Sequence, residues 1–101
     1  MLQSGFMNKS ELKKDLYKLF TSIRSEKEAQ MLLEDILTPS ELESISKRWK
    51  ELKDLSDGVP QRTIAKKLGI SISKVTRGSR VISEGSGGAK LFLKRLQKNE
   101  Q

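Results

Sequence analysis

Small polar and cationic side chains are concentrated where the sequence reads SISKVTRGSR, between residues 71 and 80. Hydroxyl, ammonium and guanidinium groups can contact base edges and phosphate oxygens in the DNA major groove. If Ile70, Ile72 and Val75 point inward, a short helix here presents these groups on its outer side. The pattern therefore predicts a polyanion-binding surface made of Ser71, Ser73, Lys74, Thr76, Arg77 and Arg80.

The residues before this segment favour a helix-turn-helix over residues 60–79. Ile64 and Leu68 are spaced to pack inward, and Ala65 is small enough to let two helices touch. Gly69 can adopt the positive φ angle that the turn requires. The first helix of the motif adds four polar candidates for DNA contact: Gln61, Arg62, Lys66 and Lys67.

Positive charge is concentrated in the same half of the chain. The 101 residues carry a formal net charge of +7. Up to Asp57, ten Lys and Arg stand against eleven Asp and Glu, whereas from Gly58 onward ten Lys and Arg face only Glu84 and Glu100. This asymmetry favours a nucleic acid or another anionic surface as the partner.

Several classes of function are excluded by composition. The chain has no Cys and no His, which rules out disulfides, zinc fingers and histidine-based catalysis. No pair of carboxylates has catalytic spacing, so we expect no catalytic residue, no metal site and no enzyme activity. No apolar run has membrane-spanning length, and the N-terminus is too short and polar for a secretory signal, so a cytoplasmic location is expected.

Helical periodicity extends along nearly the whole sequence, which predicts an all-α chain of six helices. Ser10 is predicted to cap the first helix, and Ser25, followed by Glu28, the second. Thr38 and Pro39 mark the start of a long third helix that ends at Gly58. Trp49 of this helix is predicted to pack in the core.

The remaining segments complete the expected organisation of a single domain over residues 1–101. Residues 1–9 are expected to form a flexible terminus. Short helices are predicted from Pro60 to Gly69 and from Ser71 to Ser79. Residues 83–88, SEGSGG, are predicted to be a flexible link to a last helix.

The segments LTPSE and QRTIAKKLGISISKVTRGS resemble the Trp repressor family of bacterial transcriptional regulators, roughly over residues 37–79. The resemblance implies an intertwined homodimer of six-helix subunits. It also implies sequence-specific repression at a palindromic double-stranded DNA operator, with L-tryptophan as corepressor and no other cofactor.

The resemblance further implies which residues hold the corepressor. The indole ring would stack between Arg48 and Arg77, and Gly78 would leave room over the ring. Thr38 would lie where the ligand's amino group is held from the partner subunit. Two guanidinium planes on either side of an aromatic ring are a favourable arrangement.

Three departures from the family pattern leave other functions open. Val81 cannot offer a hydroxyl to a bound amino acid, Arg80 adds a cation beside the DNA, and GVPQR is one residue shorter than usual. A ligand-independent or differently gated regulator is therefore an alternative. Two further alternatives are the DNA-targeting subunit of a transposase-like system and a helical adaptor for an acidic protein.

Overall fold

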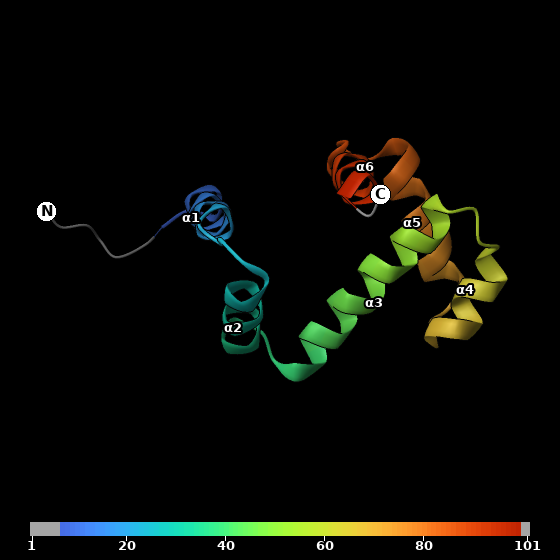
Figure 1. Ribbon diagram of the computed structural model, residues 1–101, viewed down its shortest axis with the longest axis horizontal. Helices are drawn as coiled ribbons and strands as arrows, with labels where there is room; N and C mark the ends of the chain where they lie inside the picture. Colours follow the sequence, from blue (N-terminus) through green and yellow to red (C-terminus); the bar gives the residue numbers. More distant parts are fainter. Residues whose placement is uncertain (1–6, 100–101) are drawn as a thin grey trace, which may run out of the picture. The chain divides into compact units, whose positions relative to one another are not determined.

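The computed structural model describes residues 7–99, which form six α-helices and no strand (Figure 1). This confirms the predicted all-α class. Residues 1–6 of the expected flexible terminus lie outside the described residues. No helix in the described part is long and apolar enough to cross a membrane. The chain divides between Thr38 and Pro39 into two compact units.

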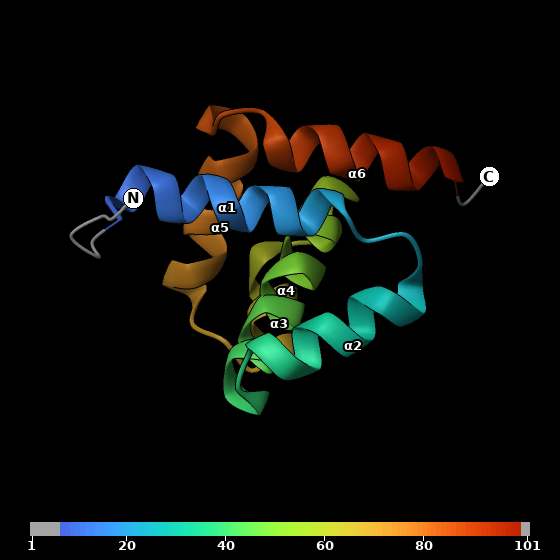
Figure 2. The ribbon, with the colours of Figure 1, turned by 90° about the vertical axis from the view of Figure 1, so that its left-hand side faces the viewer.

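The first unit contains α1 (Lys9–Thr21) and α2 (Glu26–Ile36) (Figures 1 and 2). The predicted cap Ser10 was wrong: Asn8 has extended backbone angles and its side chain accepts a hydrogen bond from the Glu11 amide at 2.8 Å. Asparagine is among the best N-caps, and it starts the helix before Ser10 can. The predicted cap Ser25 is confirmed by the Glu28 amide, which donates to its Oγ at 3.1 Å.

Neither helix of the first unit has a buried residue. Their apolar side chains recur at helical spacing yet remain open to solvent in this single chain. Leu12, Leu16 and Phe20 of α1 and Met31 and Ile36 of α2 are all more than two-fifths exposed. Contiguous apolar faces of this kind are typical of interaction surfaces.

The second unit is built around α3 (Pro39–Ser56), which starts at the predicted Pro39. Three further helices pack against α3: α4 (Gln61–Leu68), α5 (Ile72–Glu84) and α6 (Gly88–Asn99). The helices α4 and α5 also pack against each other, as do α5 and α6. The hydrophobic core of this unit consists of Leu52, Ile64, Val75 and Leu93.

The helix α5 is longer than predicted. It continues past Ser79 to Glu84, so the first two residues of the expected 83–88 link are helical. The amide of Gly85 still donates to the Val81 carbonyl at 3.0 Å, which closes the last turn. The link to α6 is correspondingly short and consists of residues 85–87.

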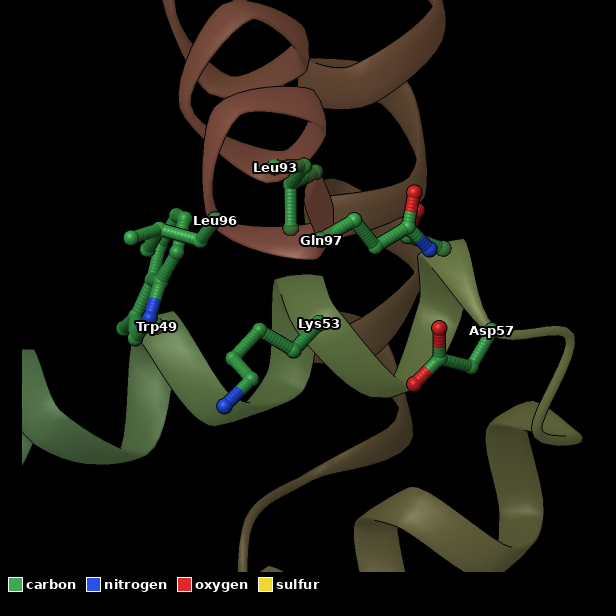
Figure 3. Close-up of a pocket in the computed structure, with 7 residues that line it drawn as sticks. Trp49, Lys53, Asp57, Leu93, Leu96 and Gln97 are labelled. Atoms are coloured by element: carbon green, nitrogen blue, oxygen red, sulfur yellow. The ribbon is translucent and has the colours of Figure 1, made fainter. Parts of the chain in front are cut away.

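Trp49, predicted to lie in the core, is partly exposed. It faces Leu93 and Leu96 of α6 across a shallow groove (Figure 3). The groove has a volume of about 40 Å³, enough for water but not for an aromatic ligand. The indole thus packs on the contact between α3 and α6 rather than inside the unit.

Candidate DNA-binding surface and ligand cavity

The α4–turn–α5 segment forms around two side chains, Ile64 and Val75, that have no solvent exposure. Gly69 ends α4 with a φ of +65°, as predicted for the turn. The next amide, that of Ile70, donates to the Ala65 carbonyl at 3.0 Å. Ser71 then caps α5, because its Oγ accepts from the Lys74 amide at 3.2 Å. The predicted helix-turn-helix is therefore formed.

The outer face of α5 brings several predicted DNA contacts together. Ser73, Thr76, Arg77 and Arg80, together with Ile72, line an open depression of about 300 Å³. The exposed α4 side chains include Arg62 and Lys66, two further predicted contacts. The arrangement is that of a protruding helix with donors along it and cations on the preceding helix, which suits groove and backbone contacts to DNA.

Some predicted contact residues also make contacts within the chain. The Thr76 hydroxyl lies 3.0 Å from Gln61 Oε1 and 3.0 Å from the Ile72 carbonyl oxygen. The first of these joins the start of α4 to the middle of α5. Gln61 and Thr76 therefore link the two helices of the motif at the surface.

Lys67 is held by a carboxylate that the sequence does not reveal as buried. Asp54 of α3 is only 4% exposed, and its oxygens accept from Lys50 at 3.1 Å and Lys67 at 3.2 Å. Burial acts to raise the pKa of Asp54, but the hydrogen bonds and charges of the two lysines outweigh it and hold this pKa below its usual value. The ion pair with Lys67 anchors α4 to α3.

Replacing Asp54 by asparagine removes the charge that pairs with Lys50 and Lys67, and it is expected to lower the free energy of unfolding at pH 7 by about 1–2 kcal/mol. The loss stays this small because both lysines are about half exposed and return to water. Because the pKa of Asp54 is lowered in the folded protein, its ionised carboxylate stabilises the fold at pH values above the usual pKa of 3.8. This stabilisation is lost as the pH falls and the carboxylate is protonated. Urea unfolding at several pH values should therefore show the difference from wild type shrinking below that pH. The exposed Asp57→Asn serves as control, and an equal effect of both substitutions would contradict the anchor.

A second cavity lies between α3 and α5 and has a volume of about 200 Å³. Three of the four residues predicted to hold a ligand line it: Arg48, Arg77 and Gly78. Thr38, the fourth, belongs to the first unit, and its role stays a prediction. The other lining residues are Glu51, Leu52, Lys74 and Val81.

Sequence reasoning missed Glu51. This residue is 5% exposed, and burial raises the pKa of its carboxyl, while the positive charges of Arg48 and Lys74 oppose the shift. A Cβ atom at Gly78 would collide with the Glu51 carboxylate and approach Leu55 Cδ1 to 3.3 Å. The space over Gly78 thus holds this side chain. Its position three residues after Arg48, on the same helical face, is the sequence signal that could have found it.

Comparison with known proteins shows similarity over most of the chain. A family model described as Trp repressor protein matches residues 11–97. A Trp operon repressor homolog from Vibrio parahaemolyticus is 37% identical over 87 residues, covering 82% of this chain and 84% of the relative. A homolog of the same name from Vibrio campbellii is 38% identical over 82% and 87% of the two chains.

A third relative comes from another organism. The Trp operon repressor homolog of Xylella fastidiosa is 37% identical over 76 residues, 72% of this chain and 80% of the relative. The match of the family model covers nearly the whole chain: it includes α2 to α5 completely and all but the first two residues of α1 and the last two of α6. Both findings extend well beyond the helix-turn-helix. The protein belongs to the Trp repressor family of transcriptional regulators.

Proposed function

We propose that this protein is a sequence-specific DNA-binding transcriptional repressor that acts in the cytoplasm and catalyses no reaction. One observation carries the proposal: α4 and α5 form a helix-turn-helix whose second helix presents Ser73, Thr76, Arg77 and Arg80 along one open face. The relatives' name, Trp operon repressor homolog, supports the same class.

In this proposal α5 enters the major groove of a double-stranded operator. Arg77 and Arg80 supply cations on the groove side, and Arg62 and Lys66 of α4 lie where phosphates flank the groove. Lys67 has less freedom to contact phosphate because its ammonium is paired with Asp54.

We further propose L-tryptophan as corepressor, bound in the cavity between α3 and α5. Arg48 comes from one helix and Arg77 from the other, so a ring stacked between them contacts both helices at once. A ligand that contacts both helices favours one angle between them. Binding of tryptophan would thereby stabilise the orientation of α5 that fits the operator.

Replacing Arg48 by alanine tests this gating. One of two stacking planes is lost, so L-tryptophan affinity measured by calorimetry is expected to fall about 10-fold. Tryptophan-dependent retention of operator DNA should fall with it, while DNA binding without tryptophan stays unchanged. Lys47→Ala is the matched control because Lys47 is a neighbouring cation already paired with Glu43 at 3.3 Å. If Arg48→Ala left the tryptophan response intact, the gating would be disproved.

A homodimer is the third part of the proposal. The apolar faces of α1 and α2 and the exposed Leu91, Phe92 and Leu96 of α6 need a covering surface, and a second copy of the chain supplies one. Two copies place two α5 helices on one duplex, which matches a palindromic operator. Sedimentation at micromolar concentration is expected to give twice the mass of one chain, and the mass of one chain would contradict the dimer.

A ligand-independent repressor is the second candidate. Two observations favour it: the Glu51 carboxylate occupies the space over Gly78, and Val81 offers no polar group to a ligand. In that case α5 would already hold its DNA-binding orientation in the free protein. Operator binding would then be the same with and without tryptophan.

A further inference from the structure

Ile72 is an apolar side chain on the otherwise polar outer face of α5. The apolar spacing of the sequence predicts that it points inward, but it is 46% exposed, whereas Ile64 and Val75 of the same motif have no exposed surface. Ile70 in the turn is partly buried. Within residues 61–79 Ile72 is therefore the one aliphatic side chain that is exposed, and packing of the motif's core does not account for it.

The first turn of α5 holds the backbone of Ile72 in place. Ile72 begins the helix directly after the cap Ser71, whose Oγ accepts from the Lys74 amide at 3.2 Å. One turn further on, the Thr76 hydroxyl lies 3.0 Å from the Ile72 carbonyl oxygen. Isoleucine branches at Cβ, so in a helix its first side-chain torsion has one strongly preferred value. The side chain thus has little freedom to lose when it contacts a partner.

The depression that Ile72 lines has the chemistry of a DNA contact. Its other lining residues are two hydroxyl side chains and two guanidinium groups, with no carboxylate among them: Ser73, Thr76, Arg77 and Arg80. A protein surface that covered Ile72 would have to be acidic as well as apolar. DNA offers both features together, because phosphates flank the major groove and the C5-methyl group of thymine projects into it.

Ile72 also lies at the end of α5 that contacts bases in this kind of motif. In helix-turn-helix proteins the N-terminal residues of the second helix contact base edges. Ile72 is the first residue of α5, and Arg77 and Arg80 follow farther along the same face. An isoleucine side chain makes no hydrogen bond to a base edge, and thymine is the base that presents a methyl group in the major groove. An apolar contact with thymine is the one that suits this side chain.

We propose that Ile72 packs against the C5-methyl group of a thymine and thereby selects an A·T pair at one position of each operator half-site. The inference rests on the DNA-binding repressor of the proposed function and names a base that it recognises. It does not depend on tryptophan gating. Burial of one methyl group corresponds to about a 3- to 5-fold change in affinity.

The test uses the duplex that the full-length protein retains most strongly from a genomic pool, with L-tryptophan present throughout. Each thymine is replaced in turn by deoxyuridine, which lacks only the C5-methyl group, and affinity is measured by fluorescence anisotropy. Wild type is expected to lose about 3- to 5-fold in affinity at one position of each half-site. Ile72→Ala should bind the unmodified duplex more weakly than wild type and should lose no further affinity at that position.

Two variants separate a methyl contact from a general loss of binding. Ile72→Val keeps the branched part of the side chain and is expected to retain part of the dependence on the methyl group. Ser73→Ala removes a hydroxyl from the same depression and, whatever its effect on affinity, should keep the full dependence. Because Ile72 is nearly half exposed, Ile72→Ala is expected to fold. Circular dichroism and sedimentation compare its helix content and mass with those of wild type.

Four results would overturn the inference. If no thymine methyl group affected wild-type binding, or if its removal weakened Ile72→Ala as much as wild type, Ile72 would not recognise thymine and the repressor would stand. If Ile72→Ala had a smaller mass than wild type, Ile72 would belong to a contact between protein chains. If wild type retained no preferred duplex, the proposed function itself would fail and the inference with it.

Discussion

Replacing Ile64 by alanine is expected to lower the free energy of unfolding by about 2–5 kcal/mol. Ile64 has no exposed surface and is the only buried residue of the eight-residue helix α4. Without it α4 loses the side chain that holds it against α5. Small proteins are stable by only about 5–15 kcal/mol, so this loss is a large share of the total. DNA binding should be lost with it.

Urea unfolding measures the loss in the free energy of unfolding for Ile64→Ala, and Ile72→Ala serves as the control. The same atoms are removed in both, but Ile72 is 46% exposed, and its loss should cost less than about 1 kcal/mol. Similar losses for the two variants would mean that α4 is not held by Ile64, and the description of the helix-turn-helix core would be wrong.

Replacing Arg77 by alanine is expected to weaken L-tryptophan binding and operator binding together, each by about 10-fold or more. Arg77 lines both the cavity toward α3 and the open depression on the outer face of α5. A ligand in the cavity and a phosphate on the duplex would therefore both contact the Arg77 side chain.

Two neighbouring arginines separate the two effects. Of the cavity and the depression, Arg48 lines the first and Arg80 the second, whereas Arg77 lines both. Arg48→Ala should therefore reduce ligand affinity, and Arg80→Ala should reduce DNA affinity with tryptophan binding unchanged. Calorimetry with L-tryptophan and fluorescence anisotropy with a labelled duplex measure the two. An Arg77→Ala protein that lost only one activity would contradict the shared role.

Local features of the fold could be predicted from the sequence. The capping by Ser25, the start of the long helix at Pro39 and the turn at Gly69 follow from residues that act within a few positions of themselves. Where prediction erred, two local signals competed. Asn8 caps α1 before Ser10 can, and α5 runs past Ser79 until Gly85 ends it.

The buried charges could not be predicted in the same way. Asp54 and Glu51 look like surface charges of a long helix, because a sequence does not show which face its neighbours cover. The packing of α4 and α5 on α3 decides this, and it gives Asp54 two lysine partners while it buries Glu51 beside Gly78. The family resemblance led to Arg48, Arg77 and Gly78, which the structure brings to one cavity, but it gave no reason to select Glu51.

The central claim is tested most directly by incubating the purified protein with a pool of genomic DNA duplexes, with and without L-tryptophan, and sequencing what is retained. A tryptophan-gated repressor should enrich one palindromic sequence only in the presence of L-tryptophan. Equal enrichment in both arms would contradict the gating and favour a ligand-independent repressor. No enrichment in either arm would contradict sequence-specific DNA binding itself.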